Sequence, residues 1–384
     1  MASSRQPTRT KSTMFRATAT PLASIFGSGF LVIVPILAGT IGRYSLFGMA
    51  AVTGFAYAVG EVIRYNIRVA EPALDNGTAG RDTVAFDRVS DLAIVVAYVI
   101  SVTLYLRILA SFLLGGLGHD TEVNEQVVTS IVIVFIVIVG VVKGLEALED
   151  LEDIALWVTL GIIAAVLIAF GVFDVRAWRG EGIVLPPTPG RSWWEIVTVL
   201  GGTLIVVQGF ETSRFLGAEF DTQVRIRSSR LSQVISTGVY LLFVALATPL
   251  MHFLGPAVED NALLTLAGKA WVLLPIPIVA AAVLSQFSAA VADTLAAEGN
   301  LVEVSRKDVT ARVAYVVIGG GALILTWSAD TLQIVALASR AFAFFYLLQC
   351  VVGMTVCKEP VRRAVMVALA GILAFITVFA VPAS

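Results

Sequence analysis

A carboxylate lies within one of the apolar segments of this sequence, in the stretch Gly209-Phe210-Glu211-Thr212. A charged side chain in the middle of a membrane is costly, so it marks a functional site by default. Glu211 could carry a proton or pair with a cationic ligand. The alternative is a fixed ion pair with Arg214, which lies three residues later and on the same face of a resumed helix.

Hydroxyl and carboxyl side chains also recur in the apolar segment 270–300. Ser285 and Ser288 lie three residues apart and are therefore neighbours on one helix face. Asp293 follows after little more than one turn, where it could bind a cation, carry a proton or face water. Serines in apolar helices also bond to their own backbone, so a purely structural role for both hydroxyls stays open.

Glycines interrupt two apolar segments, as Gly27-Ser28-Gly29 in the first and Gly209 in the sixth. Glycine costs about 1 kcal/mol relative to alanine inside a helix, so these positions predict unwound backbone. The amides of Ser28, Gly29 and Phe30 would then begin a half-helix whose positive dipole end favours an anion. The alternative is close contact between helices.

The composition identifies the environment of these segments. The chain has 384 residues, of which 58% are hydrophobic and 14% charged, and its mean hydropathy is +0.89. A bilayer must therefore be its solvent. The net charge of −2 argues against nucleic acid as a partner.

Apolar stretches long enough to cross a bilayer recur along nearly the whole chain. We predict an all-α integral membrane protein of about eleven transmembrane helices. The predicted spans are 21–41, 45–64, 90–113, 126–146, 153–174, 193–219, 230–254, 270–300, 310–327, 330–354 and 361–381.

Lys and Arg concentrate in alternate connections, which the positive-inside rule places in the cytoplasm together with the N-terminus. An odd number of spans then puts the C-terminus outside a plasma membrane. The first and sixth spans run in opposite directions and both contain an interruption, which fits two inverted five-helix repeats. We predict a cytoplasmic tail (1–20), repeats at 21–175 and 193–354 joined by an extracellular linker (176–192), and an extra helix (355–384).

Three motifs resemble the amino acid-polyamine-organocation (APC) superfamily of transporters. They are Phe-Gly-Ser-Gly-Phe at 26–30 followed by Pro35, Gly-Phe-Glu at 209–211 followed by Glu219 and the basic stretch 225–230, and Ala-Ala-Glu-Gly-Asn-Leu at 296–301. The resemblance implies the LeuT-type fold, alternating access, and a substrate site between helices one and six. The number of predicted helices and the positions of their interruptions extend this resemblance over almost the whole chain.

Within that resemblance, the backbone of residues 27–30 would hold a substrate carboxylate, and carbonyls near Gly209 would accept hydrogen bonds from a substrate amine. Phe210 could be a lid or could pack inside the protein. Sodium-coupled relatives imply a Na⁺ site of four residues here, namely Ala23, Phe26, Ser285 and Ser288. One departure is that Ala289 follows Ser288, where relatives often have adjacent hydroxyl residues.

The expected function is secondary transport of a small polar or charged solute, with an amino acid or related amine favoured and with H⁺ or Na⁺ coupling or exchange. The alternatives are an inorganic cation transporter, for example for K⁺, or a channel or gradient sensor without alternating access. Enzyme and ATP-binding motifs are absent from the sequence. We therefore expect no catalytic residue and no cofactor beyond a coupling ion, while the oligomeric state stays open.

Two further arginines, Arg107 and Arg340, fall within predicted spans. Either could anchor a substrate, replace a coupling cation or form half of a structural pair. We favour the structural pair for both.

Overall fold

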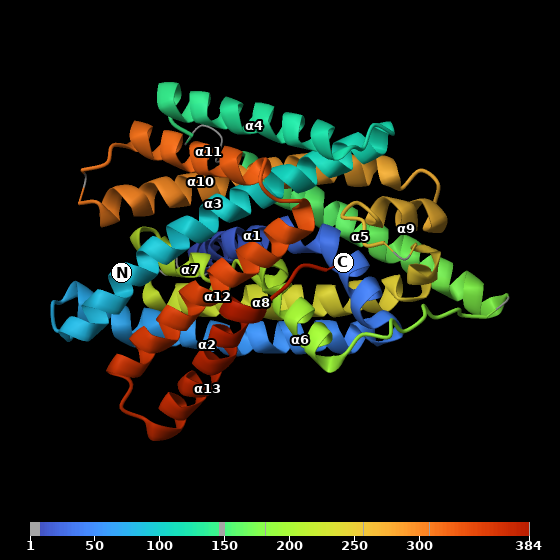
Figure 1. Cartoon of the computed structure of the whole chain (residues 1–384). Coiled ribbons are helices and arrows are strands. Elements are labelled where there is room, and N and C mark those ends of the chain that lie inside the picture. Colours follow the sequence, from blue (N-terminus) through green and yellow to red (C-terminus); the bar gives the residue numbers. More distant parts are fainter. Residues whose placement is uncertain (1–7, 146–149, 181, 256, 307, 384) are drawn as a thin grey trace, which may run out of the picture.

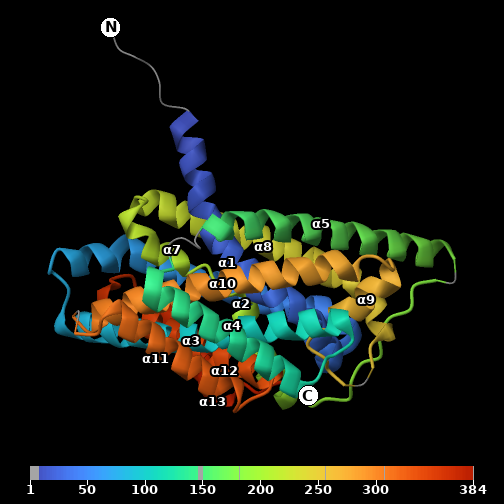
Figure 2. The same ribbon diagram turned by 90° about the horizontal axis from the view of Figure 1, so that it is seen from above.

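The computed structural model describes residues 8–145, 150–180, 182–255, 257–306 and 308–383. Within these ranges the regular secondary structure is helical, with α-helices and short 3₁₀ turns. Long helices lie side by side in an elongated bundle, and the beginning of the first helix projects from it (Figures 1 and 2).

The helices follow the predicted segments in order. The first part of the chain forms α1 (Thr8–Ile41), η1 (Gly42–Tyr44), α2 (Ser45–Asp75), α3 (Arg81–Leu117), α4 (Glu122–Lys143) and α5 (Asp150–Arg179). The second part forms α6 (Trp193–Gly201), η3 (Leu204–Val207), α7 (Thr212–Phe215), η4 (Leu216–Ala218), α8 (Thr222–Ala247), η5 (Pro249–Phe253), α9 (Leu263–Ala270), α10 (Pro275–Val304), α11 (Ala311–Thr326), α12 (Thr331–Val356) and α13 (Pro360–Phe379).

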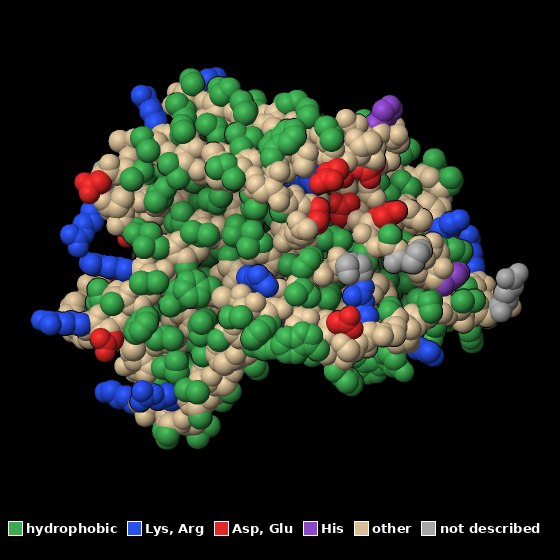
Figure 3. Space-filling model, in the orientation of Figure 1, with side chains coloured by type: hydrophobic (Ala, Val, Ile, Leu, Met, Phe, Trp, Pro, Cys, Tyr) green, Lys and Arg blue, Asp and Glu red, His purple; other side chains and the backbone are tan. Residues whose placement is uncertain are grey.

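The outside of the bundle is apolar, as expected for an integral membrane protein. Eight stretches in the described part of the chain are long and apolar enough to cross a membrane, and one of them covers both α1 and α2. Large hydrophobic side chains such as Ile131 and Ile324 are exposed on α4 and α11. Lys and Arg project from the end of the bundle where α2 connects to α3 (Figure 3); we call this the basic end.

The predicted interruption in the sixth segment is present. The chain leaves α6 at Gly201, forms η3, and then passes through Gln208 and Gly209 into the single turn of α7. Gly209 has a φ of +120°, a conformation that residues with a Cβ rarely adopt. The space beside it is also closed, because an added Cβ would lie 2.7 Å from the backbone nitrogen of Ile25 in α1.

Side chains from other helices satisfy the polar groups of this interruption. The Ser339 hydroxyl on α12 donates to the Gly202 carbonyl over 2.7 Å, and its oxygen accepts from the Ile205 amide over 3.0 Å. On α8, the Tyr240 hydroxyl lies 2.9 Å from the Val206 carbonyl. Buried backbone groups without such partners would be strongly unfavourable in a membrane protein.

The predicted interruption in the first segment is wrong. The helix α1 continues through residues 27–29 without a break. Here the glycines allow close packing, since a Cβ on Gly29 would lie 2.0 Å from the Val206 carbonyl oxygen and one on Gly27 would lie 3.2 Å from the Cβ of Ala289. These glycines therefore let η3 and α10 approach α1.

We expect Gly29→Ala to destabilise the protein by about 1–3 kcal/mol, because the new methyl group would overlap the backbone of η3. The matched control is Gly238→Ala on α8, where an added Cβ has no neighbour within 4 Å. Thermal unfolding of the purified variants in detergent measures the difference. Equal midpoints for the two variants would contradict the close α1–η3 packing.

Candidate functional site

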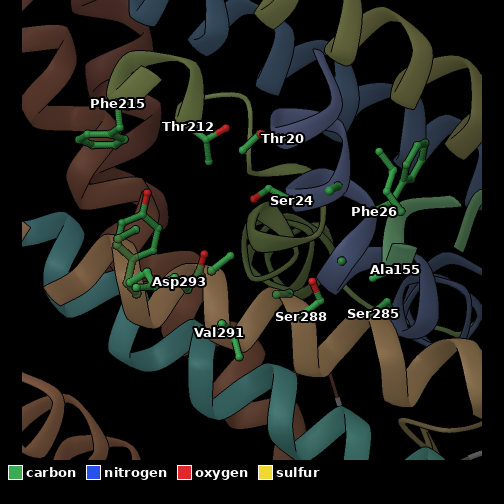
Figure 4. Close-up of a pocket in the computed structure, with 18 of the residues that line it drawn as sticks. Thr20, Ser24, Phe26, Ala155, Thr212, Phe215, Ser285, Ser288, Val291 and Asp293 are labelled. Carbon is green, nitrogen blue, oxygen red and sulfur yellow. The ribbon is translucent and has the colours of Figure 1, made fainter. Parts of the chain in front are cut away.

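A cavity of about 270 Å³ lies between α1, α5, α7 and α10 (Figure 4). Its polar lining consists of hydroxyl and carboxyl groups, on Thr20, Ser24, Tyr98, Thr159, Thr212, Glu219, Ser285, Ser288 and Asp293. Among the residues that the structure describes, no Lys, Arg or His lines the cavity. The cavity therefore offers oxygen atoms and negative charge to a bound solute.

The helix α10 contributes three of the predicted site residues. Ser285, Ser288 and Asp293 all line the cavity, as one face of a helix requires (Figure 4). The Ser285 hydroxyl donates to the Ala282 carbonyl of its own helix over 3.3 Å. Asp293 is mostly buried and accepts a hydrogen bond from the Ser101 hydroxyl of α3. Its carboxylate is thus held in place while it lines the cavity.

The helix α1 lines the cavity together with α10 and supplies the other two residues of the predicted Na⁺ site, Ala23 and Phe26. Ala23, Phe26 and Gly27 line the cavity together with Ser285 and Ser288. In a continuous helix the carbonyls of Ala23 and Phe26 bond along the helix, although each carbonyl oxygen has a second lone pair. The four residues predicted for Na⁺ therefore surround one space.

Other predicted residues of the first segment lie away from this cavity. Phe30 stacks on Phe243 of α8, with ring centroids 3.9 Å apart, and Gly29 faces η3. The side chain of Ser28 lies outside the described residues. Because α1 is continuous, the amides of residues 28–30 do not begin a half-helix, which removes the physical basis for an anion site there.

Glu211 is fully buried beside the interruption and is not among the lining residues of the cavity. Its Oε2 atom accepts hydrogen bonds from the Tyr346 hydroxyl over 2.7 Å and from the Gly209 amide over 2.8 Å. Its Oε1 atom has no hydrogen-bond partner in the described part of the chain. Phe210 is also fully buried, and its ring stacks on that of Tyr346 with the ring centroids 5.2 Å apart. In this conformation Phe210 packs inside the bundle.

A buried tyrosine on α3 contributes its hydroxyl to the cavity region. Tyr98 lines the cavity and is close enough to both Glu211 and Asp293 to interact electrostatically with them. Its hydroxyl has no hydrogen-bond partner among the described residues. This group is available to a solute or to a neighbouring carboxylate.

The expected alternative of an ion pair between Glu211 and Arg214 is wrong. Arg214 turns toward α3, where its Nη2 lies 2.5 Å from Asp87 Oδ1 and 3.9 Å from Asp91 Oδ1. It also lies 3.9 Å from Glu71 on α2. The Glu211 carboxylate points instead to the Tyr346 hydroxyl and the Gly209 amide. Arg214 instead fixes α7 to α2 and α3.

The two other arginines that the sequence placed within spans, Arg107 and Arg340, have structural partners. Arg107 of α3 forms an ion pair with Glu125 of α4 over 3.3 Å, as favoured from the sequence. Arg340 of α12 has no carboxylate partner in the recorded contacts of the described residues and donates instead to the carbonyls of Ala380 and Val378, over 2.8 and 3.2 Å. It therefore satisfies carbonyls at the end of α13, where intrahelical donors run out.

Several site residues were not identified from the sequence. On α3, Tyr98, Ser101 and Tyr105 recur with helical spacing on one face. Tyr105 accepts a hydrogen bond from Gln208 at the interruption over 3.0 Å. Gln286 of α10 donates to the Gly27 carbonyl. Polar side chains inside the apolar segments were the available signal, but a lone Tyr or Gln gives no indication of which helix it faces.

The site does not have the composition of a transition-metal centre. Among the described residues, no group of three or more His, Cys, Asp or Glu side chains is placed to hold a metal ion. A cation with weak demands on its ligands, such as Na⁺, could use the hydroxyl and carbonyl oxygens of α1 and α10.

Residues 7–381 match a family model described as APC superfamily transporter. An uncharacterized protein from Aquifex aeolicus (strain VF5) is 36% identical over 373 residues, which cover 95% of this chain and 90% of the relative.

Solved structures show the same fold at low sequence identity. The manganese transporter of Eremococcus coleocola, in complex with an aromatic bis-isothiourea substituted compound, has a TM-score of 0.59 at 11% identity. The match covers 98% of this chain and 88% of that chain. A mutant of that transporter gives a TM-score of 0.58 at 12% identity over the same shares of both chains. At this identity the likeness is informative about the fold alone.

We expect Glu211→Ala to destabilise the folded protein by about 1–3 kcal/mol, because the Tyr346 hydroxyl and the Gly209 amide would lose their buried acceptor. Glu211→Gln keeps one acceptor oxygen and should therefore destabilise the protein less than Glu211→Ala does. Thermal unfolding measures both, and Glu219→Ala, which removes an exposed carboxylate, is the control. A Glu211→Ala variant as stable as this control would contradict the role of Glu211 in holding the interruption.

Proposed function

The chain belongs to the APC superfamily of transporters, and on this premise we propose that it carries a small solute bearing an amine, such as an amino acid or related amine, by alternating access. The cavity between α1, α5, α7 and α10 would be the binding site. It has a volume of about 270 Å³, which is adequate for a small solute.

The observation that carries the proposal is the charge of the cavity lining. Asp293 is fixed by Ser101 and lines a space whose other polar groups are mainly hydroxyls, without a basic side chain among the lining residues. A carboxylate with little access to water attracts a cationic group more strongly than it would in bulk water. An ammonium group bound in the cavity would be attracted by the carboxylate of Asp293, and the hydroxyls would bind the other polar atoms of the solute.

The position of the cavity fits one stage of alternating access. Residues at its border include Thr20 near the beginning of α1 and Glu219, which is exposed after η4. If the basic end lies in the cytoplasm, as the positive-inside rule requires, this conformation faces inward. The N-terminus is then cytoplasmic and the end of α13 lies toward the outside of the plasma membrane.

In this proposal the chain crosses the membrane eleven times. Two inverted repeats of the LeuT type, residues 21–175 and 193–354, would surround the cavity, and α13 would be the added helix. The interruption between α6 and α7 supports this arrangement, because broken helices at a repeat interface form substrate sites in such transporters. The continuous α1 departs from that pattern.

Two coupling ions remain in the proposal. Na⁺ could bind the carbonyls of Ala23 and Phe26 and the hydroxyls of Ser285 and Ser288, because all four residues line one cavity. A proton could be carried by Asp293, or by Glu211, whose Oε1 atom has no hydrogen-bond partner in the described part of the chain.

An inorganic cation is the second candidate substrate. The oxygen-only polar lining would also suit a hard cation such as K⁺ or Na⁺. Manganese, named for the Eremococcus transporter, also binds oxygen ligands. It finds less support here because no group of three or more His, Cys, Asp or Glu side chains in the described part of the chain is placed to hold a metal ion. The buried carboxylate of Asp293 among hydroxyl groups makes an organic amine the leading candidate.

We expect an amine substrate to stabilise the purified protein against heat and to lose that effect in Asp293→Asn. At 100 times its dissociation constant a ligand adds about 2.7 kcal/mol to the folded state. The panel contains amino acids, polyamines, nucleobases and inorganic ions, each with and without Na⁺. Asp82→Asn, in the exposed first turn of α3, is the matched control. Stabilisation by inorganic cations alone would contradict the amine proposal.

Proton coupling through Glu211 makes a separate prediction. In proteoliposomes, Glu211→Gln should transport the substrate at a rate that no longer depends on pH, because the amide cannot take up or release a proton. The hydrogen bonds from Tyr346 and Gly209 should keep the variant folded. A mutant whose pH dependence equals that of the native protein would assign the proton to another group, with Asp293→Asn as the next variant to measure.

A further inference from the structure

A groove distinct from the central cavity lies at the basic end, between α2, α8 and α13. It has a volume of about 400 Å³. Four arginines line it, namely Arg64 and Arg68 on α2, Arg230 on α8 and Arg362 on α13. Lys and Arg side chains gather at this end of the molecule (Figure 3).

The carboxylates of the groove neutralise only part of this charge. Glu61 pairs with Arg64 over 3.1 Å and with Arg230 over 3.2 Å, and Glu359 pairs with Arg362 over 3.4 Å. Four arginines and two glutamates thus leave an excess of two positive charges in the lining. This excess favours an anionic ligand.

One of these arginines, Arg64, is buried, and hydrogen bonds hold its side chain in place. Arg64 has a side chain only 2% exposed and is fixed by Gln233 of α8, which accepts from its Nη1 over 2.5 Å. The Nε atom of Arg64 has no hydrogen-bond partner in the described part of the chain. A buried guanidinium with a free donor is a costly arrangement unless an acceptor can reach it.

Two further arginines are positioned by an aromatic ring. The guanidinium carbon of Arg362 lies 4.9 Å from the ring centroid of Tyr65, and that of Arg68 lies 5.8 Å from it. Cation–π contacts of this kind hold guanidinium groups without using their hydrogen-bond donors. Arg362 uses Nη1 in its pair with Glu359. Its other N–H groups and those of Arg68 can therefore donate to a shared ligand between α2 and α13.

The remaining lining of the groove is apolar. On α13, Val361 and Val365 are exposed, while Met366 and Leu369 are buried beneath them. In a membrane, this surface at the beginning of α13 would lie at the basic end, where the headgroups meet the acyl chains. A ligand that fits it has a phosphate for the arginines and a hydrocarbon chain for the valines.

From this geometry we propose that the groove binds one anionic phospholipid of the cytoplasmic leaflet. Its phosphate group lies among Arg64, Arg68 and Arg362, and an acyl chain follows the apolar face of α13. The lipid links α13 to α2, between which the groove lies. This role is independent of the transported substrate.

The test titrates delipidated protein in neutral detergent with phosphatidylglycerol and detects bound lipid by native mass spectrometry. The variant is Arg68→Gln with Arg362→Gln, because both side chains reach the surface and their loss should leave the fold intact. We expect it to bind phosphatidylglycerol roughly tenfold or more weakly, as the loss of two phosphate contacts implies. Arg227→Gln with Arg363→Gln removes the same charge from exposed positions outside the groove lining and should bind normally.

Three results would overturn the proposal. Equal phosphatidylglycerol affinity in both double variants would show that the groove arginines do not bind the lipid. Equal affinity of the native protein for phosphatidylcholine would exclude recognition of the headgroup charge. Equal affinity for soluble glycerol phosphate would assign the site to a free anion, since the acyl chain would then contribute nothing.

Discussion

The structure depends on how the unwound backbone between α6 and α7 is satisfied. In a bilayer, amides and carbonyls that leave a helix need partners from the protein. Here they come from Ser339 on α12, Tyr240 on α8 and the side chain of Glu211 itself. Two helices that are far apart in the sequence, α8 and α12, must therefore converge on this interruption.

This constraint also determines where the candidate site lies. Close packing of α1 against η3 requires Gly29, and the turn at the interruption requires Gly209. The helix α7 forms one side of the cavity, where Thr212 lines the same space as the hydroxyls and the carboxylate of α10. The break that demands internal hydrogen bonds thus also opens a space lined by polar atoms in an otherwise apolar bundle.

Much of this arrangement could be predicted from the sequence. Hydropathy located the helices, and the three-residue spacing of Ser285 and Ser288 placed both on one helix face. The structure adds that Asp293 lines the same cavity. The partners of Glu211 and Arg214 could not be predicted, because Tyr346 and Asp87 lie more than a hundred residues away and spacing reports only neighbours within one helix. The glycines of α1 were ambiguous, since the same residues permit unwinding or close packing.

The account places a solute in a cavity that opens alternately to either side of the membrane. Counterflow in proteoliposomes tests this most directly. Vesicles loaded with unlabelled amine and diluted into trace labelled amine should accumulate the label transiently, above its external concentration, because exchange through one alternating site drives uptake. Uptake that only equilibrates with the external concentration, with no saturation as the amine is raised, would indicate a channel and contradict the account.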